Sequence, residues 1–100
     1  MDPELSDICI ADVVVATAGR EQGKLFYVLG TEGELLLLVN GKDRTLEKPK
    51  RKKCKHVQKV LRSETRVADK LRTGDKVLNS ELRRDLAFHS RAMQSNDLGG

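Results

Sequence analysis

Aromatic residues are scarce in this chain of 100 residues, which has no tryptophan, one tyrosine and two phenylalanines. Proteins that bind single-stranded nucleic acid without sequence preference stack successive bases on several aromatic rings. Phe26, Tyr27 and Phe88 are too few for such a platform, and the core is the expected place for their rings. If the protein binds nucleic acid, recognition is therefore expected to depend on backbone charge and on shape.

Cysteines and long apolar runs are scarce as well. Cys9 and Cys54 lie far apart, which predicts reduced thiols rather than a structural disulfide. Cys54 and His56 have no two further ligands nearby, so we expect no zinc site and no other metal or cofactor. The longest apolar run, Leu35–Val39, is much shorter than the roughly 20 residues that span a bilayer. Because residues 1–4 are also acidic where a signal peptide is basic, we expect a cytoplasmic protein that does not enter membranes.

Positive charge is distributed very unevenly along the chain, although the net charge is only +4. Residues 1–41 contain two basic and seven acidic residues, residues 42–59 contain nine and two, and residues 60–100 contain eight and six. Salt screens charges more than about 8–10 Å apart, so local charge outweighs net charge. A polyanion is therefore expected to interact mainly with residues 42–59.

The first half of the chain reads as short strands. Residues 10–16 and 24–29 are rich in β-branched and aromatic residues and are bounded by glycines, which predicts two strands joined by a loop. A turn over residues 31–34 precedes the leucine run, whose continuity indicates burial on both faces or inside a closed barrel. Asn40-Gly41 is typical of a two-residue type I′ hairpin turn, so residues 42–46 are predicted to form the return strand.

Pro49 ends that return strand because it cannot donate a ladder hydrogen bond, and a last short strand is predicted over residues 56–61. Helical spacing follows over residues 64–71, with Ser63 as the expected cap and Gly74 just past the end. A second helix is expected to start after Asn79 or Ser80, with an apolar stripe of Leu82, Leu86 and Met93.

These elements predict a mainly β fold, a small β-barrel with a C-terminal helical appendage. The expected divisions are an N-terminal segment (residues 1–9), the barrel (10–61) with its basic segment (48–59), the helical appendage (62–93) and a flexible tail (94–100).

The segment V-V-V-A-T-A-G-R-E-Q-G-K, residues 13–24, resembles the KOW motif, in which an apolar strand enters a glycine-bearing loop that leads to a basic residue and a second strand. The signature glycine of the motif corresponds to Gly23. The similarity continues through residues 35–42 and 46–53 and covers residues 10–59 in all. The chain is thus similar to small bacterial KOW-domain proteins that resemble a eukaryote- and archaea-type large-subunit ribosomal protein. This resemblance implies an SH3-like barrel that binds RNA.

The predicted function is RNA binding without catalysis, associated with the ribosome or with translation; ribosomal RNA is the expected partner, and ribosomal proteins are a further one. The basic run of residues 48–59 supports RNA binding, because it is dense enough for several simultaneous phosphate contacts. The candidate RNA-binding residues are Arg20, Lys24, Lys42, Arg44, Lys48, Lys50, Arg51, Lys52, Lys53, Lys55, His56 and Lys59. Two alternatives for the basic segment remain open: a charged sheet edge that discourages association, and a nuclear localisation signal.

Three glycines are candidate structural loop residues: Gly19, Gly23 and Gly41. Left-handed conformations at Gly19 and Gly23 would bring backbone N–H groups close to phosphates, or they would only turn the chain. The segment is not a nucleotide-binding P-loop, because three residues separate these two glycines where four are required and no Ser or Thr follows Lys24.

No catalytic grouping is evident, and neither an enzymatic activity nor a small-molecule substrate is expected. Asp12, Glu32 and Glu34 read as solvated strand ends or turns, and His89 as a surface or helix-packing residue. The alternative function is a protein-interaction barrel that uses the acidic half, residues 1–41, as its contact surface.

Overall fold

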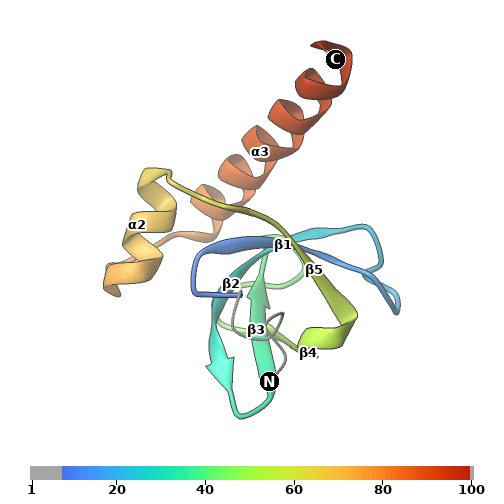
Figure 1. Cartoon of the computed structure of the whole chain (residues 1–100). Helices are drawn as coiled ribbons and strands as arrows, with labels where there is room; N and C mark the ends of the chain where they lie inside the picture. Colours follow the sequence, from blue (N-terminus) through green and yellow to red (C-terminus); the bar gives the residue numbers. More distant parts are fainter. Residues whose placement is uncertain (1–7, 100) are drawn as a thin grey trace.

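The computed structural model describes residues 8–99, which form a mainly β domain with two helices after the sheet (Figure 1). This confirms the predicted order of strands followed by helices. The elements are β1 (Asp12–Ala16), β2 (Leu25–Glu32), β3 (Leu35–Val39), β4 (Lys50–Lys53), the 3₁₀ helix η1 (Cys54–His56), β5 (Val57–Arg62), α2 (Arg66–Thr73) and α3 (Asn79–Gly99).

The strands form one antiparallel sheet in the order β4-β3-β2-β1-β5. β4 and β5 are therefore its two edges, which would lie about 19 Å apart in a flat sheet. The chain from Lys53 to Val57 passes through η1 and reaches at most about 14 Å. The sheet must therefore curl so that these edge strands approach each other at η1. Bulges between Val13 and Val14 and between Val28 and Gly30 add the local twist that such curling needs.

Side chains on the two faces of the sheet build two separate apolar clusters, since successive strand residues point to opposite faces. One face buries Val14, Ala16, Phe26, Val28, Leu36, Leu38 and Val57. The other face buries Ala11, Val13, Tyr27 and Val39 against Val67, Ala68, Val77, Leu82 and Leu86 of the helical region. The leucine run was expected to be buried on both faces or inside a closed barrel. Leu36 and Leu38 are buried on the first face, whereas on the second, which the helices cover, Val39 is buried and Leu35 and Leu37 are half-buried.

The predicted return strand over residues 42–46 is wrong. Asn40 lacks the positive φ that a type I′ turn requires, and its side-chain oxygen accepts hydrogen bonds from the amides of Lys42 and Arg44, both at 3.0 Å. These bonds fold residues 40–49 into a loop. The strand that pairs with β3 is β4, the basic run after Pro49, with Leu38 opposite Lys50 and Leu36 opposite Lys52.

The helix boundaries differ from prediction at two places. Thr65, and not Ser63, caps α2 by accepting a hydrogen bond from the Ala68 amide at 3.2 Å, while Gly74 ends the helix as expected. Helix α3 begins at Asn79, slightly earlier than the start expected after Asn79 or Ser80, and it continues to Gly99, so residues 94–99 of the predicted flexible tail are helical. No proline interrupts that segment, and Ala92, Met93 and Gln94, at and just before its start, favour helix.

Candidate nucleic-acid interface

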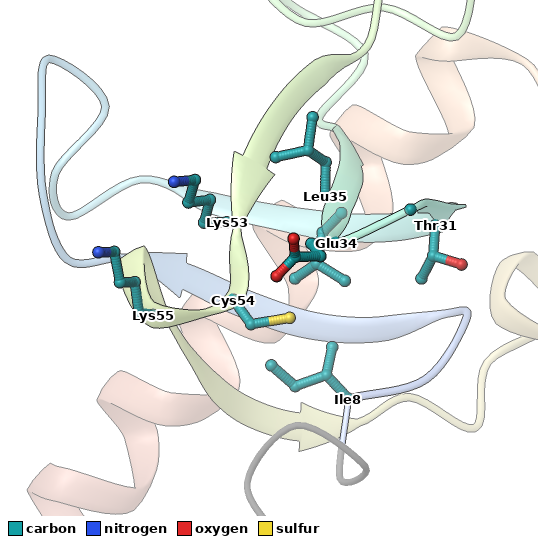
Figure 2. Close-up of a pocket in the computed structure, with 9 residues that line it drawn as sticks. Ile8, Thr31, Glu34, Leu35, Lys53, Cys54 and Lys55 are labelled. Atoms are coloured by element: carbon teal, nitrogen blue, oxygen red, sulfur yellow. The ribbon is translucent and has the colours of Figure 1, made fainter. Parts of the chain in front are cut away.

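The densest positive charge lies on β4, an edge strand of the sheet, and on η1, which follows it directly. Pairing with β3 fixes the backbone of β4, so its side chains alternate between the two faces of the sheet. Lys53 and Lys55 point to the same side of this segment, whereas the Cys54 thiol points the other way, toward Ile8 in a hollow of about 500 Å³ (Figure 2).

The loop of residues 17–24, which carries the KOW-like glycines, lies against this basic segment. The Thr17 amide donates to the carbonyl oxygen of His56 at 2.8 Å. A Cβ atom placed on Gly19 would lie 3.3 Å from the Lys52 ammonium nitrogen. Gly19 and Gly23 have φ values of 80° and 90°, the left-handed conformations expected of them, but the Gly23 amide donates to the Ala16 carbonyl and is not available to a phosphate.

Glu21, the one acidic residue of this loop, is buried and bound internally. Its carboxylate accepts a hydrogen bond from the Arg44 guanidinium at 2.5 Å. This bond from Arg44 holds the pKa of Glu21 below its usual value, and the nearby charges of Lys50 and Lys52 lower it further. The carboxylate is therefore ionised at neutral pH and forms an ion pair with Arg44, whose side chain is 33% exposed.

Four of the twelve candidate RNA-binding residues lie in ion pairs: Lys24 with Asp43 (2.8 Å), Arg44 with Glu21 (2.5 Å), Arg51 with Glu32 (2.6 Å) and Lys59 with Asp12 (3.3 Å). The Lys24 ammonium, with help from Asn40, lowers the pKa of Asp43 to about 2. The pairs of Lys24 and Arg51 are exposed on both sides, so water and salt screen them and a phosphate can compete for either cation.

The other eight candidates form no ion pair with a carboxylate among residues 8–99: Arg20, Lys42, Lys48, Lys50, Lys52, Lys53, Lys55 and His56. Lys42 and Lys48 belong to the loop 40–49. The remaining six belong to β4, η1 and the loop that lies against them, and we call Arg20, Lys50, Lys52, Lys53, Lys55 and His56 the basic edge. Lys50 and Lys52, paired with Leu38 and Leu36, lie on one face of β4, whereas Lys53, paired with Leu35, lies on the other. The basic edge thus carries charge on both faces of this strand, and its members are separated by up to 36 positions in the chain.

The acidic residues of the N-terminal half do not gather into an acidic surface where the structure describes them. Asp12 was expected at a solvated strand end, but it is 1% exposed, because its carboxylate accepts from the Cys9 amide at 2.7 Å and pairs with Lys59. Glu32 is exposed and paired with Arg51, which leaves Glu34 as an exposed carboxylate in the turn after β2. Asp2, Glu4 and Asp7 lie outside the described residues.

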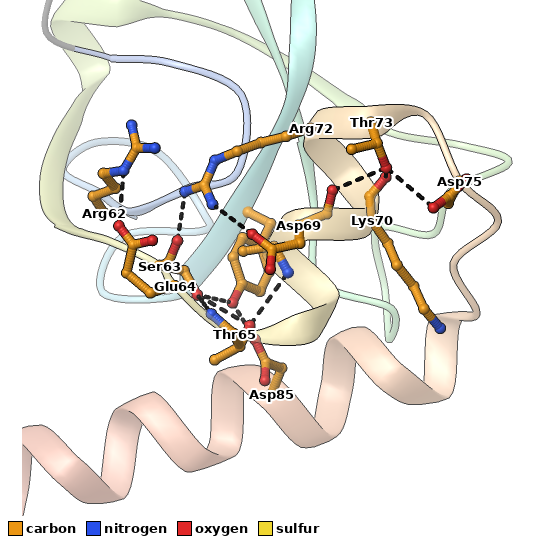
Figure 3. A network of polar contacts seen from close by, with 12 residues as sticks. Arg62, Ser63, Glu64, Thr65, Asp69, Lys70, Arg72, Thr73, Asp75 and Asp85 are labelled. Atoms are coloured by element: carbon orange, nitrogen blue, oxygen red, sulfur yellow. Dashed lines mark hydrogen bonds and ion pairs between the residues drawn. The ribbon is translucent and has the colours of Figure 1, made fainter.

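A buried polar network joins β2, the end of β5 and α3 (Figure 3). The Tyr27 hydroxyl, at the centre, lies 2.8 Å from Ser63 Oγ and 3.2 Å from His89 Nε2, and it donates to the Asp85 carboxylate. Thr65, the cap of α2, also donates to Asp85 at 2.8 Å. Burial, and then the bond to Asp85, raise the pKa of Tyr27 to about 12.

This network contains serine, histidine and aspartate, a grouping that sequence reasoning did not find. Ser63 Oγ and an Asp85 oxygen lie 3.0 and 3.7 Å from the same ring nitrogen, Nε2 of His89. In a catalytic triad the hydroxyl and the carboxylate face opposite ring nitrogens. Ser63 is also fully buried, which leaves its hydroxyl out of reach of a substrate. The contacts of Ser63, His89 and Asp85 instead join α3 to the sheet. His89, for which a surface position was also considered, is 7% exposed.

The aromatic residues are placed differently from one another. Phe26 and Tyr27 are fully buried, as expected, but Phe88 is 56% exposed on α3, so its predicted core position is wrong.

Cys9 and Cys54 are both free thiols. In the described part of the chain, no three His, Cys, Asp or Glu side chains converge to hold a metal ion, and neither helix is both long and apolar enough to cross a membrane.

Neither a protein-family model nor a curated protein matches this chain. Its fold and surface define a class in general terms: a small, mainly β domain with two C-terminal helices and a strongly basic sheet edge.

Proposed function

We propose that the protein binds RNA without catalysing a reaction, and that the basic edge contacts the RNA backbone. The observation that carries this proposal is the cluster of lysines on β4 and η1, which are held on a fixed backbone. They form no ion pair with a carboxylate of the described residues, although Lys50 and Lys52 lie close enough to Glu21 to lower its pKa. Several cations that contact adjacent phosphates release counterions together, which is the main source of affinity for nucleic acid.

Resemblance to KOW-domain proteins supports RNA over DNA and favours ribosomal RNA as the target, in the cytoplasm. In this proposal the curled sheet is an SH3-like barrel of the KOW type, whose β4 and β5 edges approach at η1. The loop of residues 17–24 contributes Arg20 to the same surface, since its first residue is hydrogen-bonded to His56.

A protein-interaction barrel remains the alternative function. It would need an acidic contact surface from residues 1–41, but Asp12 and Glu21 are buried there and Glu32 is paired with a cation. The distribution of charge over the described residues therefore favours a polyanionic partner.

Charge removal at the basic edge tests the proposal. Replacing Lys50, Lys52 and Lys53 by Gln is expected to weaken RNA binding at least tenfold, equivalent to about 1.4 kcal/mol, in a fluorescence-anisotropy titration with a structured ribosomal RNA fragment. Lys53 is exposed, whereas Lys50 and Lys52 are half-buried and their charges act on Glu21. The free energy of unfolding should therefore change by about 1 kcal/mol or less per substitution.

The matched control replaces Arg62, Arg66 and Lys76 by Gln, which removes the same charge from exposed positions outside the basic edge. This control should keep the parent affinity within about threefold, since distant charges are screened. A basic-edge variant that folds and binds RNA as tightly as the parent would contradict the proposal. If the basic-edge variant does lose affinity, crosslinking of the parent in cells, followed by sequencing of the attached RNA, shows whether ribosomal RNA is the target.

A further inference from the structure

Phe88 is an exposed aromatic residue on a helix whose neighbouring apolar positions are buried. It is 56% exposed, whereas Leu82 and Leu86 of the same helix are 0% and 7% exposed. The ring lines a hollow of about 420 Å³ between α2 and α3. We call the residues of this hollow the α3 hollow: Val67, Glu81, Arg84, Asp85, Phe88 and Arg91.

The phenyl ring has one buried aromatic neighbour, which is tilted against it. Its centroid lies 5.3 Å from that of the His89 imidazole, with 59° between the ring planes. His89 is itself buried and lies within hydrogen-bonding distance of Ser63 Oγ and the Tyr27 hydroxyl. This contact with a buried, hydrogen-bonded imidazole limits the freedom of the phenyl ring, while more than half of the residue stays exposed to a flat ligand.

Two arginines flank the ring on the same side of the helix. Arg84 precedes Phe88 by four residues and Arg91 follows it by three, and residues at these spacings are neighbours on a helix surface. Neither guanidinium forms an ion pair within the described part of the chain. The charge of Arg84 acts on the nearby Glu81 carboxylate and lowers its pKa, but no direct pair holds either guanidinium, so an anionic ligand can reach both.

The two carboxylates of the hollow are already engaged elsewhere. Glu81 accepts from the Lys70 ammonium at 3.0 Å and from the Leu78 amide at 2.9 Å. Asp85 turns toward Thr65 and the Tyr27 hydroxyl (Figure 3). The groups that the hollow leaves for a partner are thus one aromatic ring between two guanidinium groups.

We propose that the α3 hollow takes one unpaired RNA base, which stacks on Phe88 while Arg84 and Arg91 contact the phosphates on either side of it. Every base has a π-face that stacks on an aromatic ring, and its flanking phosphates supply the negative charge that the two arginines need. This inference rests on the proposed RNA-binding function and specifies the substrate: structured RNA with an exposed unpaired nucleotide, rather than continuous duplex.

The test uses two RNA probes and the full chain. One probe is a hairpin with 2-aminopurine, a fluorescent base, in its unpaired loop; the other is a continuous duplex of the same length with 2-aminopurine paired. Phe88→Leu keeps an apolar side chain but removes the aromatic face. It should weaken binding of the hairpin about five- to 100-fold, abolish the quenching of 2-aminopurine and leave duplex binding unchanged.

Three further variants separate stacking from charge and from general apolar contact. Phe88→Trp should restore both affinity and quenching, because the indole ring stacks at least as well. Arg84→Gln with Arg91→Gln should weaken hairpin binding but leave the quenching at saturation. Leu78→Ala, at an apolar position that is 52% exposed and outside the α3 hollow, should behave as the parent.

The inference is overturned if the parent binds the hairpin and Phe88→Leu binds it equally well with the same quenching. It is also overturned if Phe88→Leu changes only self-association in sedimentation, or only the binding of an acidic peptide. Failure of the parent to bind either probe would instead reject the proposed function itself.

Discussion

At the scale of single residues, the buried Tyr27 hydroxyl shows how one polar atom organises the core. Tyr27 lies on β2 with no exposed surface, and a buried hydroxyl must be hydrogen-bonded to avoid the cost of desolvation. Ser63 and His89 lie within hydrogen-bonding distance of the hydroxyl, and the Asp85 carboxylate accepts a hydrogen bond from it. The neutral tyrosine is therefore stabilised by folding, and the tyrosinate is not.

Ionisation of Tyr27 is the first prediction at this scale. The pKa of about 12 exceeds the ordinary value of 10.0, so the stabilisation is complete below pH 10 and is lost as the pH rises toward 12. Two pKa units correspond to about 3 kcal/mol of unfolding free energy. Because Tyr27 is the only tyrosine and there is no tryptophan, tyrosinate absorbance reports this group alone.

The folded protein should show little tyrosinate absorbance at pH 10.5, about half a unit above the pKa of a free tyrosine, whereas the protein in concentrated denaturant should titrate near pH 10. Half-ionisation near pH 10 in both states would show that the hydroxyl is not buried as described.

At this scale the sequence identified the core aromatics Phe26 and Tyr27 but not the partners of the hydroxyl. Ser63, Asp85 and His89 follow Tyr27 by 36, 58 and 62 positions. No local pattern connects residues so distant, and only the packing of α3 on the sheet brings them together. The exposure of Phe88 has the same origin, since the direction of the apolar stripe of α3 depends on where the sheet lies.

At the scale of elements, the loop of residues 40–49 explains why the hairpin prediction failed. Asn40-Gly41 did mark a turn, but the contacts that decide its form come from α3. The Leu46 amide donates to the Asn79 side chain at 2.9 Å, and Arg83 donates to the Gly41 carbonyl at 2.6 Å. These tertiary contacts override the local preference for a two-residue hairpin.

Alanine at Gly41 and at Gly23 should therefore have different effects on stability. Both glycines have positive φ, 76° and 90°, so either substitution incurs a backbone strain of about 1–2 kcal/mol. Only at Gly41 would the new Cβ collide with protein, at 2.2 Å from the Asn79 carbonyl oxygen, whereas nothing lies within 4 Å at Gly23.

Gly23→Ala should lower the Tm by about 4–15 °C, and Gly41→Ala should lower it clearly further. Thermal unfolding followed by circular dichroism measures both variants. Equal losses would mean that the loop 40–49 does not pack on the start of α3.

The basic run shows a complementary limit of sequence reasoning at this scale. Its charge was evident, but lysine and arginine have no strong preference for strands, so nothing local predicted β4. The strand forms because the free edge of β3 offers hydrogen-bonding groups to residues 50–53. That pairing places the lysines at regular spacing along one edge of the sheet.

At the scale of the whole molecule, the order of elements could be predicted because hydrophobic periodicity and glycine positions are local signals. The curl of the sheet could not be predicted from those signals, because it follows from the pairing of β1 with β5 and the short η1 connection. The candidate site was predicted as a charged segment, but which cations are available depends on ion pairs such as Lys24–Asp43 that join distant loops.

Salt dependence of RNA binding tests whether local charge, rather than net charge, determines affinity. If the five lysine and arginine residues of the basic edge each contact one phosphate, log K should fall against log salt with a slope of about −3.5 for single-stranded and −4.5 for duplex RNA. The Gln variant of Lys50, Lys52 and Lys53 removes three contacts, so its slope should flatten to about −1.4 to −1.8. The control at Arg62, Arg66 and Lys76 has the same net charge, yet it should keep the parent slope because its lost charges touch no phosphate. Anisotropy titrations over a series of salt concentrations give all three slopes. Equal flattening in both variants would mean that the basic edge makes no localised contacts and that RNA responds only to the overall field of the protein.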